Sequence, residues 1–164
     1  MRIVIATAGV LSPEPVARFA ERLAGGDGRV CVITVIEVPR SFLDEIRSEQ
    51  WHPLSDGTAA WSTEEDAVIA RYVEERGGRL TDPLLAALAS HGVEAEVRFL
   101  EGEDPATMII AAAEDFDADL VVMGATKHLF DESHWESVSA RVLRESRLPV
   151  LVIPTGPHLT TEDS

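Results

Sequence analysis

The stretch from Asp119 to Pro154 constrains the fold more strongly than any other part of the chain. It opens with an apolar run, Leu120 to Met123, which ends at Gly124. A polar loop and a segment with apolar residues at helical spacing follow, and a second apolar run from Val150 to Ile153 closes the stretch. A strand, a loop, a helix and a strand form half of a parallel α/β unit, whose ligand sites lie at the carboxyl ends of the strands. A loop that leaves a strand on glycine and enters a helix N-terminus is also where a phosphate would bind.

The preceding segments alternate in the same way. Residues 2–8 and 30–38 are apolar and rich in β-branched side chains, which predicts two buried strands. Between them, Ser12 and Pro13 are typical of a helix start, and Gly25-Gly26 of a helix end. The inner face of this helix is predicted at Val16, Phe19, Ala20 and Leu23.

Residues 93–100 alternate between apolar and charged side chains, which predicts a half-exposed strand at a sheet edge. The turn at residues 102–105 then caps a further helix. The inner face of that helix is predicted at Met108, Ile109, Ala112 and Phe116.

The middle of the chain has the weakest pattern. Residues 39–62 are interpreted as a variable surface excursion with a short helix at 41–48 and two isolated tryptophans, Trp51 and Trp61. Ser62 and Glu65 form a capping box, which predicts a helix through about Arg76. Because Gly77-Gly78 weaken a helix and Thr81-Asp82-Pro83 resemble a fresh start, we expect a kink or two helices that end near His91-Gly92.

Together these elements predict five strands and about four main helices in a single α/β domain over residues 1–154, built as a three-layer sandwich around a five-stranded parallel sheet. Residues 155–164 are polar and are expected to fray as a C-terminal tail.

The composition indicates which partners and which cellular compartment to expect. The formal net charge is −15, with 14 Lys and Arg against 29 Asp and Glu, which disfavours nucleic acid and anionic membrane surfaces as partners. No apolar run approaches the roughly 18 residues of a membrane span, and the N-terminus reads directly as a strand with no signal-peptide layout. The single cysteine, Cys31, lies in an apolar run and fits a reducing compartment. We therefore expect a cytoplasmic protein.

Four segments together resemble the universal stress protein (UspA-like) family. They are ATAG at residues 6–9, EGEDPA at 101–106, ADLVVMGA at 118–125 and ESVSARVLRESRLPVLVIP at 136–154. The resemblance implies a Rossmann-like sheet of the adenine-nucleotide alpha-hydrolase-like type, and a homodimer. In many members the last strand pairs with its twin across the two-fold axis, a role that would fall to Val150, Leu151, Val152 and Ile153. A short, apolar strand at an edge would invite aggregation unless a partner covers it.

Nucleotide-binding members of this family resemble one another in an Asp at the end of the first strand and in a glycine pattern: Gly, two residues, Gly, nine residues, Gly, then Ser or Thr. Here the first glycine is Gly124, but Lys127 and Glu136 stand at the second and third glycine positions, and Ala8 at the Asp position. By this resemblance the nucleotide pocket, in degenerate form, is assigned to Thr7, Ala8, Val35, Met123, Gly124, Thr126, Lys127, Glu136, Ser137, Val138 and Ser139.

Each change has a physical meaning. Glycines let phosphate oxygens approach backbone N–H groups without a Cβ in the way. Glu136 puts a carboxylate at the positive helix end where a phosphate would bind, and each such repulsive pair costs about 1–4 kcal/mol. Residues 133–136 also form a capping box, so the helix could start a turn earlier and fill the pocket with Trp135. In the other direction, Lys127 can serve a phosphate as a point charge.

The sequence therefore predicts a regulatory or protective homodimer without a nucleotide cofactor, acting through contacts with an unidentified protein partner. Two alternatives stay open: an ATP- or AMP-responsive switch, and a nucleotide-dependent enzyme on the same fold. No catalytic set is recognisable, and His128 and His134 lack a usual metal-ligand spacing. His91 ends a helix, where a cation favours the helix dipole.

Overall fold

A five-stranded parallel sheet forms the centre of the molecule. The computed structural model describes residues 1–49, 58–125 and 137–154, with side chains in these ranges except at 46–49 and 58–64. The strands are β1 (Arg2–Ala6), β2 (Arg29–Ile36), β3 (Ala95–Glu101), β4 (Leu120–Ala125) and β5 (Val150–Pro154), in the order β3-β2-β1-β4-β5. Every neighbouring pair is parallel, which confirms the predicted α/β sandwich and the edge position of residues 95–101.

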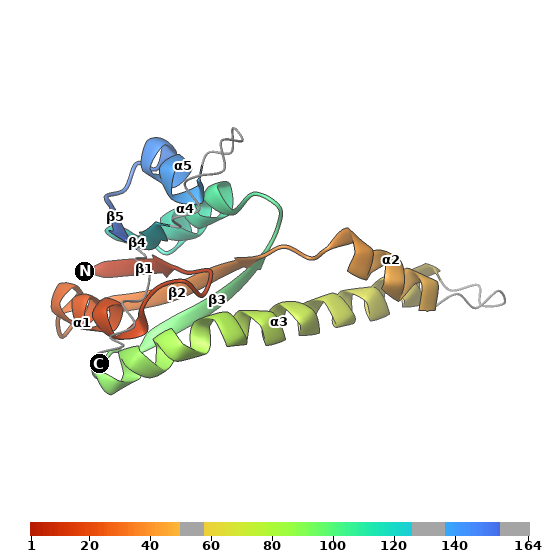
Figure 1. Cartoon of the computed structure of the whole chain (residues 1–164), viewed down its shortest axis with the longest axis horizontal. Coiled ribbons are helices and arrows are strands. Elements are labelled where there is room, and N and C mark those ends of the chain that lie inside the picture. Colours follow the sequence, from red (N-terminus) through yellow and green to blue (C-terminus); the bar gives the residue numbers. More distant parts are fainter. Residues whose placement is uncertain (50–57, 126–136, 155–164) are drawn as a thin grey trace, which may run out of the picture.

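Helices cover both faces of this sheet (Figure 1). Helices α1 (Pro13–Ala24) and α3 (Thr58–Ser90) lie on one face, and α4 (Pro105–Asp115) and α5 (Val138–Glu145) lie on the other. The central strand β1 alternates between them: Ile3 and Ile5 belong to the α1/α3 core, and Val4 and Ala6 to the α4/α5 core. The strand is therefore buried on both faces, as its apolar run predicts.

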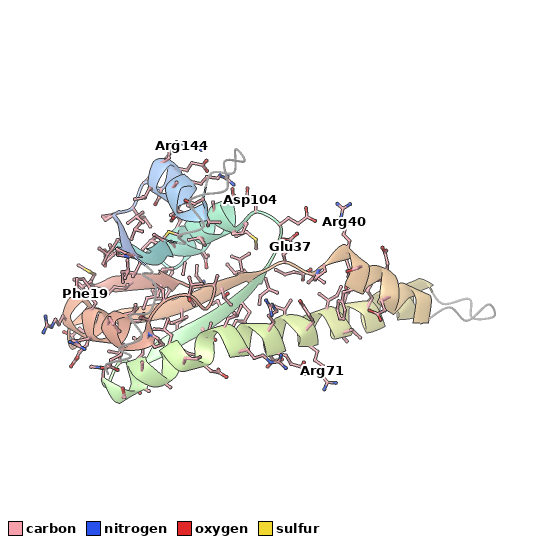
Figure 2. All side chains as sticks on the ribbon, in the orientation of Figure 1. Phe19, Glu37, Arg40, Arg71, Asp104 and Arg144 are labelled. Carbon is pink, nitrogen blue, oxygen red and sulfur yellow. The ribbon has the colours of Figure 1, made fainter. Side chains whose placement is uncertain are left out.

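The inner faces of two helices differ from the prediction. In α1 the buried residues are Val16, Ala17, Ala20 and Ala24, whereas Phe19 is 47% exposed and points outward (Figure 2). Successive residues of a helix point about 100° apart, so Phe19 does not share the direction of the buried Ala20. The side of α1 that packs on the sheet is formed by smaller residues instead. In α4 the buried positions are Ala106, Ile109 and Ala113, with Phe116 buried just after the helix; the predicted Met108 and Ala112 are only half-buried.

The prediction of two separate helices within residues 62–91 was wrong: α3 is one helix of 33 residues with Pro83 inside it. Gly77 is buried where the helix crosses β3, and a Cβ at this position would lie 2.5 Å from the ring of Phe99. The glycine thus permits a close approach of helix to sheet rather than ending the helix. One turn later, the buried Thr81 hydroxyl donates to the Gly77 carbonyl at 2.8 Å.

The N-terminal part of α3 extends beyond the sheet together with α2 (Arg40–Glu49), which confirms the short helix predicted at 41–48 (Figures 1 and 2). The rings of Phe42 and Tyr72 pack together with their centroids 4.8 Å apart. Trp51 and the side chain of Trp61 lie outside the described residues.

At the opposite end of α3, His91 ties this helix to α1. Its Nε2 lies 2.7 Å from Glu14 Oε1, and its Nδ1 lies 2.9 Å from Glu21 Oε2. Two carboxylates can both accept hydrogen bonds only from the doubly protonated imidazolium. The hydrogen bond with Glu14, and next that with Glu21, raises the pKa of His91 above its ordinary 6.5. The sequence suggested only a favourable interaction of His91 with the dipole of the helix that it ends. In the structure, His91 also connects this helix to two glutamates of α1.

The two adjacent glycines of α3 should respond oppositely to alanine. Gly77→Ala drives a methyl group into Phe99, and we expect it to lower the free energy of unfolding by about 1–3 kcal/mol. Gly78→Ala is the matched control, because its Cβ would meet nothing closer than Asp82 at 3.9 Å and alanine is the better helix former by up to about 1 kcal/mol. Urea denaturation measures both; destabilisation of equal size in the two variants would contradict the close-approach explanation.

The His91 link should also make stability depend on pH. Because the pKa of His91 is higher in the folded state, its contribution is fully present below the unfolded value of 6.5 and is lost as the pH rises through the folded pKa. We expect the difference in melting temperature between the wild type and His91→Gln, which cannot titrate, to be larger at pH 6 than at pH 9. A difference that is constant across this range would refute a charged link.

Candidate functional site

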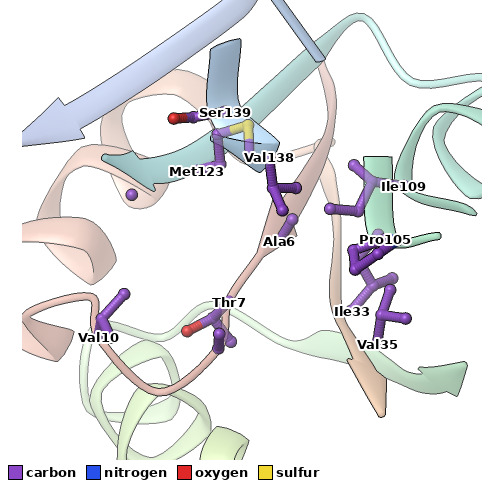
Figure 3. Close-up of a pocket in the computed structure, with 12 residues that line it drawn as sticks. Ala6, Thr7, Val10, Ile33, Val35, Pro105, Ile109, Met123, Val138 and Ser139 are labelled. Atoms are coloured by element: carbon purple, nitrogen blue, oxygen red, sulfur yellow. The ribbon is translucent and has the colours of Figure 1, made fainter. Parts of the chain in front are cut away.

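A cavity of about 160 Å³ opens at the carboxyl ends of β1 and β4, where the strand order reverses direction (Figure 3). Open α/β sheets bind their ligands at this topological position. The cavity is lined by Ala6, Thr7, Ala8, Val10, Ile33, Val35, Pro105, Ile109, Met123, Gly124, Val138 and Ser139.

The loop after β1 forms one wall. Thr7 N–H donates to the Ile33 carbonyl at 3.0 Å, and the Thr7 hydroxyl accepts from the Gly9 N–H at 3.0 Å. Gly9 has φ +80°, a conformation that favours glycine, and a Cβ there would lie 2.8 Å from Leu80 Cδ2. The loop is thus held against both β2 and α3, and it leaves Val10 44% exposed at the cavity.

The start of α5 forms the opposite wall. Ser137 is the N-cap, and its hydroxyl accepts from the Ala140 N–H at 3.2 Å and lies 3.2 Å from the Ser139 hydroxyl. The helix begins at Val138, so the expectation of a start one turn earlier was wrong. A serine hydroxyl that caps the first turn satisfies the free N–H groups locally, which sets the boundary here. Trp135 lies outside the described residues.

A latch between α4 and α5 fixes the third side. Asp104 caps α4, accepting from the Thr107 N–H at 3.4 Å and the Thr107 hydroxyl at 2.7 Å, and it receives Arg141 Nη1 of α5 at 2.8 Å. The hydrogen bonds from Thr107, and next those from Arg141, lower the pKa of Asp104 to about 2. The carboxylate is therefore charged at every ordinary pH. Pro105 directly follows Asp104, and it lines the cavity together with Val138 of α5, so this ion pair joins the two helices at the rim of the cavity.

The cavity is apolar in character. Among the residues that the structure describes, its lining contains no charged side chain, and the polar side chains there are the hydroxyls of Thr7 and Ser139. Both hydroxyls already have partners within the protein. Apolar cavities of about 150 Å³ hold a single ring such as benzene. The described walls thus offer room and contacts for one flat ring but no charged side chain to pair with a charged tail.

The structure places most of the residues assigned from the sequence around one cavity. The structure brings together seven of the assigned residues, with Ser137 next to them at the N-cap, while Thr126, Lys127 and Glu136 lie outside the described residues. The seven are Thr7, Ala8, Val35, Met123, Gly124, Val138 and Ser139. Sequence reasoning missed five lining residues: Ala6 at the end of β1, Val10 in the loop after it, Ile33 within β2, and Pro105 and Ile109 of α4.

The comparisons with known proteins agree with this architecture. The model of the universal stress protein family matches residues 1–154. The chain belongs to the universal stress protein family. No curated protein matches it.

Solved structures show the same fold at low sequence identity. The hypothetical protein MJ0577 is 21% identical, with a TM-score of 0.63 over 95% of this chain and 96% of that one. A universal stress protein solved in complex with cAMP is 20% identical, with a TM-score of 0.56 over 95% and 98%. An Arabidopsis thaliana family member, At3g01520, solved with AMP bound, is 14% identical, with a TM-score of 0.59 over 99% and 97%.

Two other kinds of site find no support in the part of the chain that is described. No group of three or more His, Cys, Asp or Glu side chains is placed to hold a metal ion there, and His128 and His134 fall outside it. No helix within the same residues is long and apolar enough to cross a bilayer.

Proposed function

We propose that this universal stress protein is a cytoplasmic homodimer that acts through contacts with other proteins and does not bind ATP tightly. The observation that carries the proposal is the wall after β1. Where a carboxylate would be needed to hold a nucleoside, the apolar Ala8 lines the cavity, and none of the described lining residues carries a charged side chain. A polar ligand loses its hydrogen bonds to water when it enters a site. If the site offers too few polar groups to replace these bonds, the affinity falls.

The sequence around the expected phosphate position supports the same conclusion. Glu136 immediately precedes the N-cap Ser137, and Asp131 and Glu132 stand in the same loop. A carboxylate near the positive end of a helix takes the electrostatic role that a phosphate would have, and it repels a second anion. The net charge of −15 adds to this repulsion.

The homodimer is proposed through β5. Val150, Leu151, Val152 and Ile153 are each partly exposed, and among the described strands β5 pairs only with β4. Unlike β3, the run from Val150 to Ile153 carries no charge that would discourage edge-to-edge pairing. A copy related by a two-fold axis would bury this apolar edge against itself.

A nucleotide-responsive switch is the second candidate. It is favoured by the cavity itself, which keeps Gly124 at the end of β4, and by the family members solved with AMP and with cAMP. Lys127 would then be the cation that meets a phosphate. An adenylyl-transferring enzyme on this fold has no comparable support.

Thermal unfolding with and without nucleotide separates the two candidates. A ligand at about a hundred times its Kd stabilises by about 2.7 kcal/mol, which at this size is a rise in melting temperature of roughly 5–10 °C. We expect no such rise for the wild type with millimolar ATP or AMP. We expect one for the triple variant Ala8→Asp, Lys127→Gly and Glu136→Gly, which restores the binding pattern. A rise of that size in the wild type would overturn the proposal.

The dimer has a separate test. Sedimentation equilibrium at tens of micromolar should give a dimer for the wild type and a monomer for Val152→Lys, because a lysine at the shared edge places two like charges together. Leu143→Lys on α5 is the matched control, since Leu143 is 53% exposed and lies outside β5, and it should remain a dimer. A monomeric wild type would refute the β5 interface.

A further inference from the structure

The edge strand β3 has two chemically different faces. On the α4 side, its charged residues are paired within the molecule: Glu96 with Arg29, and Arg98 Nη1 with Asp115 Oδ2 at 2.9 Å. On the α3 side, Ala95, Val97 and Phe99 are apolar and Glu101 ends the strand, and Val97 is 41% exposed although it pairs with the fully buried Val32. Among the described strands β3 pairs only with β2, so its outer backbone edge has no strand partner there.

Two hollows lie along this apolar side, where β3 runs beside α3 (Figure 1). A hollow of about 400 Å³ at the end of the strand has Val73 of α3 and Phe99 of β3 in its walls. A hollow of about 690 Å³ at the start of the strand has Leu85 of α3 and Ala95 of β3 in its walls. Ala95 and Phe99 are four residues apart, which is about 13 Å along a strand, with the exposed Val97 midway between them.

Acids without a side-chain partner among the described residues line both hollows. Glu74 and Glu101 line the first hollow, and Glu94 lines the second. None of the three makes an ion pair or side-chain hydrogen bond with the described residues, in contrast to Glu96 on the opposite face. Two hollows that have apolar residues and a carboxylate in their walls, with the exposed Val97 between them, are complementary to a segment that is apolar in the middle and cationic at its ends.

We propose that the edge of β3 binds an extended segment of a partner protein as an additional strand. The segment places alternate apolar side chains on the α3 side, above the two hollows, polar ones on the α4 side, and a lysine or arginine near each end. In this mode the backbone hydrogen bonds supply affinity, and the pockets for alternate side chains supply specificity. This inference rests on the proposed action through protein contacts, and it names the surface and the chemistry of the partner.

The probe is a fluorescent nine-residue peptide with lysine at its first and last positions, threonine at the even positions and valine at the remaining odd ones, so that the lysines and valines share one face. Its binding to the full chain is followed by anisotropy at two salt concentrations. Two control peptides have either glutamate in place of lysine or N-methyl groups on the backbone nitrogens of one edge. We expect each change to weaken binding about tenfold or more, because the first reverses the charge complementarity and the second removes strand pairing at unchanged charge.

Matched protein variants locate the site. Val97→Lys should weaken binding about tenfold or more, whereas Leu143→Lys, which makes the same change at an exposed apolar residue of α5, should not. The double variant Glu74→Gln and Glu101→Gln should weaken binding and reduce its salt dependence. Glu114→Gln on α4 serves as its control.

Several results would overturn the inference. These are no binding of the lysine peptide, equal binding of the N-methylated peptide, equal weakening by Leu143→Lys, or loss of self-association in Val97→Lys, which would make a second copy the occupant. The N-methylated peptide needs no variant and decides the matter even if Val97→Lys fails to fold. The nucleotide titration is independent of all these measurements, so failure here is distinguishable from failure of the proposed function.

Discussion

The requirement that β1 be buried on both faces determines how the rest of the chain is arranged. Ile3, Val4 and Ile5 have no exposed surface, and the strand is paired in parallel on both sides. Parallel neighbours cannot be joined by tight turns, so each connection must cross over a face of the sheet, and helices then cover both faces. From β1 the chain continues to β2 on one side and later returns to β4 on the other, and the cavity lies at the carboxyl ends of β1 and β4, at this change in strand order.

The fold produces a cavity at this position whatever residues line it. The cavity therefore need not retain the polar groups that would bind a ligand there. Here the described lining carries no charged side chain, and Asp104 at the rim pairs with Arg141, which also pairs with Glu145. The ion pair between Asp104 and Arg141 holds α4 against α5 at the rim and leaves neither group free for a ligand. What the described walls keep is an apolar slot between the loop after β1 and the start of α5. The same architecture therefore supports a binding pocket and a structural remnant equally well, and only the polar groups decide between them.

The sequence predicted those features whose causes are local. Apolar runs located the five strands, Asp104 before Pro105 marked a helix cap, and the family motif located most of the cavity lining. Features caused by distant residues were missed. Gly77 looked like a helix breaker because nothing nearby in sequence shows that Phe99 will press against it.

The latch between Asp104 and Arg141 joins residues 37 positions apart, and the pairing of His91 with α1 spans 70 and 77 positions. Neither could be read from periodicity, which reports only the neighbours along one helix or strand. The predicted roles of Lys127 and Glu136 fall outside the described residues and stay predictions.

The two open edges of the sheet suit different partners. The core of β5, Val150 to Ile153, carries no charge, so a second copy of β5 can approach it without electrostatic cost. A second copy of β3 in the antiparallel register that sets residue 94 opposite residue 101 would place Glu94 against Glu101, and like charges directly opposite one another destabilise a strand pair. Self-pairing is therefore favoured at β5, whereas the unpaired acids beside β3 favour a cationic segment from another protein. One sheet can in this way hold its own twin at one edge and leave the other edge open for a partner, with no need for a nucleotide in the cavity between them.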